Sequence, residues 1–152
     1  MKAIQIVEDS LVWEEIKLPE PKKDEVLIKI SATAINRADL AQRAGNYPPP
    51  EGETDILGLE CSGIIVKVGE NVSENRIGEE VCALLAGGGY AEYVCCPSIQ
   101  AIKTPTNLSL IESASLPEVF ATCWLNLFLE GNLSQGQNIL LHAGASGIGT
   151  AA

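Results

Sequence analysis

The sequence predicts a mostly β barrel followed by the beginning of an α/β nucleotide-binding unit. Short alternating or apolar segments, separated by turn residues, occupy the chain up to Pro105. Beyond Pro105 the apolar residues follow the spacing of helices rather than of strands. Near the end, a short apolar run at 139–141 leads into a glycine-rich turn and then into small residues. This is the order of parts in a dinucleotide-binding βα unit.

Composition limits the domain count and the classes of partner. A chain of 152 residues with 46% hydrophobic content can bury the core of one complete domain, together with part of a second. Its 20 acidic and 10 basic residues give a net charge of -10, which disfavours nucleic acid and anionic membranes. No apolar stretch approaches the roughly 20 residues of a membrane helix, and the first residues lack a signal-peptide pattern. We therefore expect a soluble, cytoplasmic protein.

The five cysteines form no C-x-x-C pair, so the spacing of a zinc site is absent. Cysteine packs well in apolar interiors, and these residues have apolar neighbours. We expect buried structural thiols, except that Cys95 and Cys96 point to opposite strand faces, which leaves one of them open to oxidation. The single histidine, His142, is expected at a strand end or in the core.

The first part of the chain predicts a β-hairpin and a longer strand. Residues 1–7 and 11–18 alternate and are broken by Glu8-Asp9-Ser10, which is typical of a hairpin. Residues 25–34 alternate clearly, with one buried face formed by Val26, Ile28 and Ile30.

A short helix and an irregular loop are expected next. The side chain of Asn36 can accept the unpaired N–H groups of a first helical turn, and Gly45 suits a left-handed helix end. Residues 46–52 contain three successive prolines, which supply no N–H, and therefore predict a loop.

Further strands complete the predicted barrel. Residues 58–68 form an apolar, β-branched strand, and an acidic loop follows it. Residues 81–85 and 90–95 are interpreted as two strands joined by the tight connection 86–89, whose glycines we do not expect to bind phosphate. About seven short strands with one small helix favour a closed or nearly closed barrel.

Helical signals begin after Pro105. Ser109 and Glu112 have the spacing of a capping box, which predicts a short helix that Pro117 would interrupt. Residues 119–129 predict a buried helix ending near Gly131. We place the domain boundary at Leu116, giving domains 1–116 and 117–152.

Several ordered motifs carry a family resemblance: AINRADL (34–40), GNYPPP (45–50), GLECSG (58–63), GGGYAEYV (87–94) and HAGASGIG (142–149). With them the chain resembles the amino-terminal half of the zinc-free quinone oxidoreductases of the medium-chain dehydrogenase/reductase superfamily, the zeta-crystallin-like branch. It is most similar to the subgroup of the tumour-suppressor-inducible quinone oxidoreductase of vertebrates.

The resemblance implies a mostly β GroES-like barrel followed by the first β-strand and turn of a truncated α/β Rossmann domain. NADPH and substrate would lie in the cleft between them, and the full-length protein would be a homodimer. Where the zinc alcohol dehydrogenases place a metal cysteine and a metal histidine, this chain has Asn36 and Leu59. Neither side chain can replace a thiolate or an imidazole on zinc, so we expect no metal.

The same resemblance implies roles for individual residues. Asn36 would face nicotinamide or substrate, Tyr47 would offer its hydroxyl, and Asp39 would shape the pocket. Their structural alternatives are a helix cap, a loop anchor and a surface ion pair. Thr122 would meet the nicotinamide carboxamide, or else bond to its own helix backbone. The turn would bind NADPH through Ala143, Gly144, Ala145, Ser146, Gly147, Ile148 and Gly149.

Three functions remain open. The leading hypothesis is metal-independent, NADPH-dependent reduction of quinones by the full-length parent, the 152-residue chain being inactive alone. An enone or aldehyde reductase would use the same hydride geometry. A non-catalytic GroES-like binding or assembly module is the third, in which 139–141 would be an exposed sheet edge.

Overall fold

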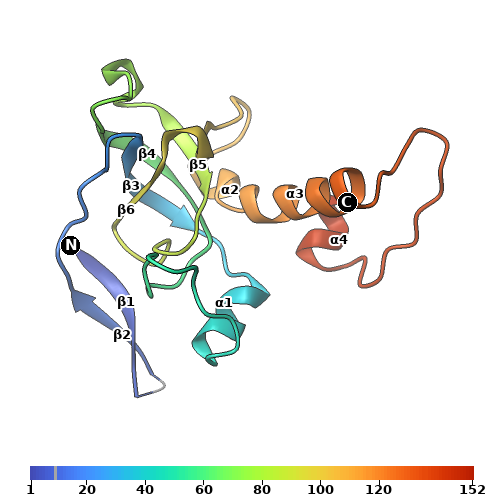
Figure 1. The fold of residues 1–152 in the computed structure, drawn as a ribbon, viewed down its shortest axis with the longest axis horizontal. Helices are drawn as coiled ribbons and strands as arrows, with labels where there is room; N and C mark the ends of the chain where they lie inside the picture. The colour runs from blue at the N-terminus through green and yellow to red at the C-terminus, as the bar shows by residue number, and fades with distance from the viewer. Residues whose placement is uncertain (9) are drawn as a thin grey trace.

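The computed structural model describes residues 1–8 and 10–152 and shows a β-rich body from which a helical arm extends (Figure 1). The predicted fold class, a mostly β barrel followed by the start of a Rossmann domain, is confirmed. The strands are β1 (Lys2–Val7), β2 (Ser10–Glu15), β3 (Glu25–Thr33), β4 (Glu60–Val68), β5 (Glu80–Leu84), β6 (Tyr93–Pro97) and β7 (Ala101–Lys103). The helices are α1 (Arg37–Arg43), η1 (Glu74–Arg76), η2 (Ser98–Gln100), α2 (Leu110–Ser113), α3 (Pro117–Cys123), η3 (Trp124–Glu130) and α4 (Gly147–Ala151).

The strands form two sheets. β1 and β2 pair in antiparallel fashion, as the hairpin prediction requires, although Asp9 of its turn lies outside the described residues. The other five strands form a curled sheet in the order β6-β3-β4-β5-β7. A single bridge between Ala3 and Ala91 joins the hairpin to the barrel.

The predicted hairpin of 81–85 and 90–95 is wrong in its pairing. β5 pairs with β4 and β7, whereas β6 pairs with β3 on the opposite side of the sheet. The glycine connection therefore crosses the barrel: the N–H groups of Gly88 and Gly89 donate to the carbonyls of Ile56 and Gly58. Gly87 and Gly88 have φ angles of 155° and 91°, which an L side chain rarely adopts. The three-residue strand β7 is too short to show a period in the sequence.

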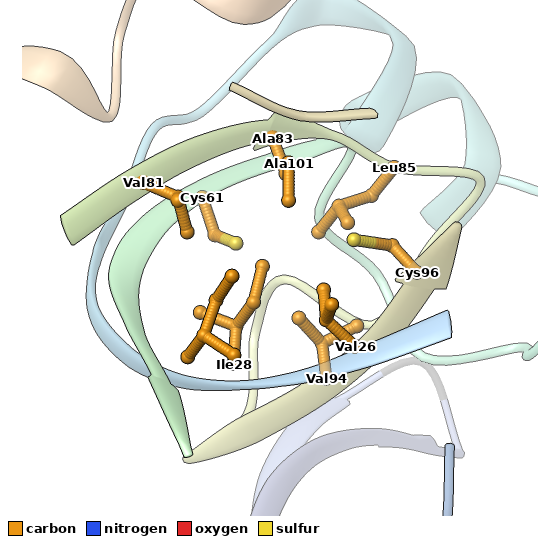
Figure 2. Packing of buried hydrophobic residues seen from close by; sticks show 10 residues of the cluster. Val26, Ile28, Cys61, Val81, Ala83, Leu85, Val94, Cys96 and Ala101 are labelled. Atoms are coloured by element: carbon orange, nitrogen blue, oxygen red, sulfur yellow. The ribbon is translucent and has the colours of Figure 1, made fainter. Parts of the chain in front are cut away.

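The core lies inside the curled sheet (Figure 2). Side chains from five strands point toward one another there, and most of them are fully buried. Val26 and Ile28 of β3 lie on the predicted buried face, but Leu27 on the other face is also buried. The core residues are Val26, Ile28, Cys61, Ile65, Val81, Ala83, Leu85, Val94, Cys96 and Ala101.

Both capped helices form where the sequence predicts them. Asn36 is the N-cap of α1, and its backbone N–H donates to the Asp39 carboxylate at 2.7 Å. Gly45 follows the helix with a φ of 74°. Ser109 caps α2, where it forms a capping box with Glu112.

The helical arm differs from the prediction. Pro117 begins α3 rather than only interrupting its predecessor, because the first helical turn needs no N–H at that position. The helix then continues as the π-helical segment η3 up to Gly131. The expectation that 119–129 is buried is wrong: Phe120, Trp124 and Leu129 are 52%, 59% and 61% exposed. The arm projects from the barrel (Figure 1), and the short helix α4 packs against α3 without burying these three side chains.

The predicted strand at 139–141 does not form, and His142 beside it is exposed. A strand needs a neighbour to pair its backbone N–H and C=O groups. No strand of the described residues lies beside this run. The glycine turn after it nevertheless leads into α4.

Within the part of the chain that the structure describes, none of the helices has the length and apolar character needed to cross a membrane.

The cysteines are free thiols, as expected. Cys96 points into the core (Figure 2), whereas Cys95 does not belong to the core cluster and is partly buried. Burial, with a smaller effect of the nearby Glu25 and Glu20, raises the pKa of Cys95 to about 11, and burial is the main cause that raises the pKa of Cys96 to about 12. Burial also raises the pKa of Cys61 and of Cys82. The predicted oxidisable residue therefore carries little thiolate.

The thiols should react slowly in the folded protein. At pH 8 a thiol with the pKa of Cys95 is thiolate for roughly a thousandth of the time, and only the thiolate is nucleophilic. Labelling with a disulfide reagent should be slow in buffer and complete in denaturant, with Cys95 the first site modified. Rapid modification of a core cysteine such as Cys61 at pH 8 would contradict this account.

Gly63→Ala should destabilise the barrel by about 2–3 kcal/mol, because overpacked cores lose stability on this scale. A Cβ on Gly63 would lie 2.1 Å from the carbonyl oxygen of Lys29, in the paired strand β3. Urea unfolding followed by circular dichroism measures the change. Gly144→Ala is the control, since nothing lies within 4 Å of its ideal Cβ, and it should change stability by less than about 0.5 kcal/mol. Equal effects of the two substitutions would contradict the prediction.

Candidate functional site

A cleft of about 380 Å³ lies where the barrel meets the start of the helical arm and the glycine turn. From the barrel side it is lined by Asn36 and Glu60, which precede α1 and begin β4. From the other side it is lined by Gly147 and Thr150 of α4. Segments more than 80 residues apart in the sequence thus meet in one cavity. The remaining lining residues are Ala34, Ile35, Ser115, Leu116, Val119, Phe120 and Ala151.

Glu60 is a charged residue in an apolar strand and is only 1% exposed. Its Oε1 accepts a hydrogen bond from Asn36 Nδ2 at 2.7 Å, and its Oε2 accepts one from the backbone N–H of Glu118 at 3.0 Å. A buried carboxylate needs such donors to offset its lost hydration. Glu60 therefore joins the start of α1 to the start of α3.

Asp39 is 2% exposed, so its alternative as a surface ion-pair member is wrong. Its carboxylate accepts three hydrogen bonds: from the backbone N–H of Asn36 at 2.7 Å, from the backbone N–H of Gly58 at 3.2 Å and from the Tyr90 hydroxyl at 3.0 Å. These bonds fasten α1 to the loop before β4 and to the glycine connection. Asp39 acts on the cleft by fixing the backbone from which Asn36 extends.

Two neighbouring groups have raised pKa values. Burial raises the pKa of the Tyr90 hydroxyl, and the charge of Asp39 and its hydrogen bond raise it further. Burial also raises the pKa of Glu118, as do the charges of Glu60 and Asp39, whereas a hydrogen bond with Thr122 opposes them.

The glycine turn has the backbone form that a dinucleotide requires. Ser146 caps α4, its Oγ accepting from the N–H of Gly149 at 3.1 Å. A Cβ on Gly149 would lie 2.5 Å from the carbonyl oxygen of Ala143, so this glycine is needed for packing. Gly144 faces open space, which lets a phosphate approach the backbone. Ala143 holds the turn with a φ of 54°. The turn therefore leaves room for a phosphate beside its backbone.

The donor set at the expected metal position does not fit zinc. Leu59 is an apolar, buried side chain, and Asn36 directs its Nδ2, a hydrogen-bond donor, at Glu60. Among the described residues, no group of three or more histidine, cysteine or acidic side chains is arranged to hold a metal ion. Thiolate and imidazole ligands are both missing from these two positions.

The structure brings together only some of the predicted site residues. Asn36 and Gly147 line the same cleft, but the side chains of Tyr47, Asp39 and Thr122 do not line it. Tyr47 is 48% exposed on the proline loop, and its role stays a prediction. Sequence reasoning missed Glu60 as a partner of Asn36, although a lone carboxylate inside an apolar strand is a usable signal of a buried polar network.

Comparison with known proteins agrees with this architecture. The family described as the alcohol dehydrogenase GroES-like domain matches residues 22–106. The human synaptic vesicle membrane protein VAT-1 homolog-like is 36% identical over 134 residues, which cover 88% of this chain and 32% of the relative. The chain thus spans about a third of that relative's length.

Among solved structures, the CurK enoyl reductase superposes with a TM-score of 0.88 at 28% identity, over 99% of this chain and 49% of its own. A mycobacterial protein in complex with NADPH gives a TM-score of 0.86 at 30% identity, over 99% and 48%. A Pseudomonas syringae quinone oxidoreductase gives 0.82 at 27% identity, over 98% and 47%.

The family model matches more than half of the chain, and the fold agrees with it: a barrel is followed by a glycine turn. This chain belongs to the alcohol dehydrogenase GroES-like domain family, within the medium-chain dehydrogenase/reductase superfamily of oxidoreductases.

Proposed function

We propose that the chain forms the substrate-binding part of an NADPH-dependent oxidoreductase that reduces quinones by hydride transfer without a metal. The observation that carries this proposal is the cleft in which Asn36 and Glu60 of the barrel meet Gly147 and Thr150 of α4, the helix that follows the glycine turn. The mycobacterial NADPH complex and the P. syringae quinone oxidoreductase, which share the fold, support it. The catalytic activity belongs to a longer protein that contains this chain.

Reduction of a quinone places modest demands on the protein. NADPH supplies a hydride, which carries two electrons to the quinone, and a proton from solvent completes the hydroquinone. Because the quinone is already electrophilic, the protein mainly has to hold the ring and donate hydrogen bonds to the oxygen that gains negative charge. Metal polarisation is unnecessary for this reaction, in keeping with an amide and a leucine at the positions of zinc ligands.

Asn36 is the proposed donor to that oxygen. It is the polar side chain that reaches the cleft from the start of α1. One N–H of its amide is bound to Glu60, and the other remains as a donor. Tyr47 is a second proposed donor, and Thr122 a proposed contact of the nicotinamide carboxamide. Ala143, Gly144, Ala145, Ser146, Gly147, Ile148 and Gly149 are proposed to hold the dinucleotide.

Finer assignments complete the proposal. The protein is placed in the zeta-crystallin-like branch, near the vertebrate tumour-suppressor-inducible subgroup, on the ordered motifs of the sequence. We propose a cytoplasmic homodimer for the full-length protein. We propose NADPH and not NADH as the cofactor, on the same resemblance.

Reduction of α,β-unsaturated carbonyls is the second candidate, favoured by the CurK enoyl reductase among the superposed structures. A hydride delivered to the β-carbon leaves negative charge on an enolate oxygen. The same donor at Asn36 would stabilise that oxygen.

The full-length protein should oxidise NADPH with simple quinones in a metal-free buffer. Asn36→Ala should lower kcat by about tenfold to a hundredfold, because it removes a donor to the developing negative charge. Asn71→Ala, which alters an exposed hydrogen bond to Asp24, is the matched control and should leave kcat unchanged. Absorbance at 340 nm follows the reaction.

Substrate competition separates the two candidates. Higher kcat/KM for enones than for all quinones tested would favour the enone reductase. No turnover of quinones, or activity only with added zinc, would refute the proposal. NADPH titrated into the 152-residue chain should bind weakly, and tight binding would show that this part alone forms the cofactor site.

Asp39→Asn should destabilise the fold by about 1–3 kcal/mol, the range for a buried donor left without an acceptor. One amide presents a single acceptor oxygen, whereas three donors now meet the Asp39 carboxylate. Thermal and urea unfolding measure the loss. The control is Asp24→Asn, whose exposed bond to Asn71 contributes less than about 0.5 kcal/mol. Unchanged stability of Asp39→Asn would contradict its role as a buried support.

A further inference from the structure

Glu60 is a buried ionisable group that the proposed reaction does not use. It begins β4, with Cys61 and Ser62 buried beside it, and its side chain lines the cleft while being 1% exposed. Its backbone carbonyl accepts from the Thr33 hydroxyl at 2.7 Å, which fixes the start of the strand. Its position is therefore set from both the main chain and the side chain.

The hydrogen bonds of Glu60 determine the orientation of a neighbouring amide. Both oxygens of a carboxylate accept hydrogen bonds and neither donates. The group of Asn36 at 2.7 Å from Oε1 is therefore its Nδ2 and not its Oδ1. Because the amide is planar, its oxygen and its second N–H are then directed away from Oε1. If the amide nitrogen and oxygen of Asn36 exchanged places, Oδ1 would face Oε1 of Glu60, and neither oxygen could donate a hydrogen bond.

The second oxygen of Glu60 prevents the carboxylate from turning. Oε2 accepts from the backbone N–H of Glu118 at 3.0 Å, close to the beginning of α3. A backbone N–H of a first helical turn lacks a partner in its own helix, so this bond satisfies it. Glu60 is thus held by α3 while it holds Asn36.

We propose that Glu60 is a positioning residue: it keeps the Asn36 amide in the orientation that presents an N–H to a carbonyl or quinone oxygen in the cleft. This inference rests on the proposed function. Glu60 itself does not touch the reacting atoms and acts through Asn36. Its negative charge also polarises the amide, which strengthens the remaining N–H as a donor.

Glu60→Gln is the informative substitution. Glutamine has the same length but offers one acceptor oxygen and one donor nitrogen, whereas Asn36 and the N–H of Glu118 both need an acceptor. One of the two hydrogen bonds must be lost. Glu92→Gln is the matched control. Glu92 also accepts a hydrogen bond from a backbone N–H, that of Lys2, but in an exposed position.

The first experiment uses NMR on the 152-residue chain labelled with nitrogen-15. The side-chain amide of Asn36 should exchange one proton more slowly than the exposed amide of Asn107, and its resonances should shift in Glu60→Gln but not in Glu92→Gln. Rapid exchange of both Asn36 protons in the unchanged chain would overturn the inference, as would identical spectra of Asn36 in all three proteins.

The second experiment is a double-mutant cycle in the full-length protein. Glu60→Gln should lower kcat with quinones on the order of tenfold and should lower it no further when residue 36 is already alanine, as expected for coupled residues. An equal loss in both backgrounds would show that Glu60 acts independently of Asn36 and would refute the inference.

The two experiments separate this inference from the proposed function. If the unchanged full-length protein turns over no quinone, the proposed function fails, and NMR still decides whether Glu60 orients the amide. If turnover is normal and Glu60→Gln leaves it unchanged, the inference alone fails. Should Glu60→Gln not fold, Glu60→Asp takes its place, because aspartate keeps both acceptor oxygens but is one methylene shorter and cannot hold both partners at the observed distances. Asn36 amide resonances that stay unchanged in Glu60→Asp would refute the inference.

Discussion

Burial of the Glu60 carboxylate is the constraint on which the arrangement of the cleft depends. A carboxylate without water is costly unless donors replace its hydration. Glu60 finds them at the N-cap of α1 and at the first turn of α3. One charged group therefore ties the barrel to two helices that come from distant parts of the chain. The buried Asp39 carboxylate acts in the same way, because it accepts hydrogen bonds from the start of α1, from Gly58 in the loop before β4 and from Tyr90.

Both carboxylates hold Asn36, whose side chain lines the cleft. Glu60 accepts a hydrogen bond from the side-chain amide of Asn36, and Asp39 accepts one from its backbone N–H. At one of the positions that the resemblance assigns to a zinc ligand, the Asn36 amide instead donates a hydrogen bond to the Glu60 carboxylate and lines the cleft. Such a site is suited to donating a hydrogen bond to a substrate oxygen and not to binding a hydroxyl on a metal. The proposed reduction of quinones follows from this chemistry and from the glycine turn across the cleft.

Local signals predicted much of the fold. Capping residues marked α1 and α2, and Ser146 and the glycines that follow it marked the turn before α4, because hydrogen bonds at helix starts depend on neighbouring residues. Alternation predicted β3 closely, and an apolar, β-branched composition predicted β4. The strand partners of β5 and β6 were predicted wrongly, since the glycine connection between these two strands can equally turn back or cross the barrel. The run 139–141 has the composition of a strand, but a strand also needs a partner, which no local pattern reveals.

The candidate site shows the same division. Asn36 was predicted because both its motif and its capping position single it out. Glu60 was overlooked as its partner, since the contact joins residues 24 positions apart and depends on how β4 lies beside α1. Asp39 was expected to shape the pocket, but its hydrogen bond with the Tyr90 hydroxyl joins residues 51 positions apart. Long-range polar contacts of this kind follow from the folded barrel.

The most direct test of the central claim is a crystal structure of the full-length protein with NADPH and a slowly reacting quinone. The account predicts a quinone oxygen within about 3.2 Å of Asn36 Nδ2, with that nitrogen still bonded to Glu60. A quinone held away from Asn36, or an Asn36 amide turned with its oxygen toward the substrate, would contradict it.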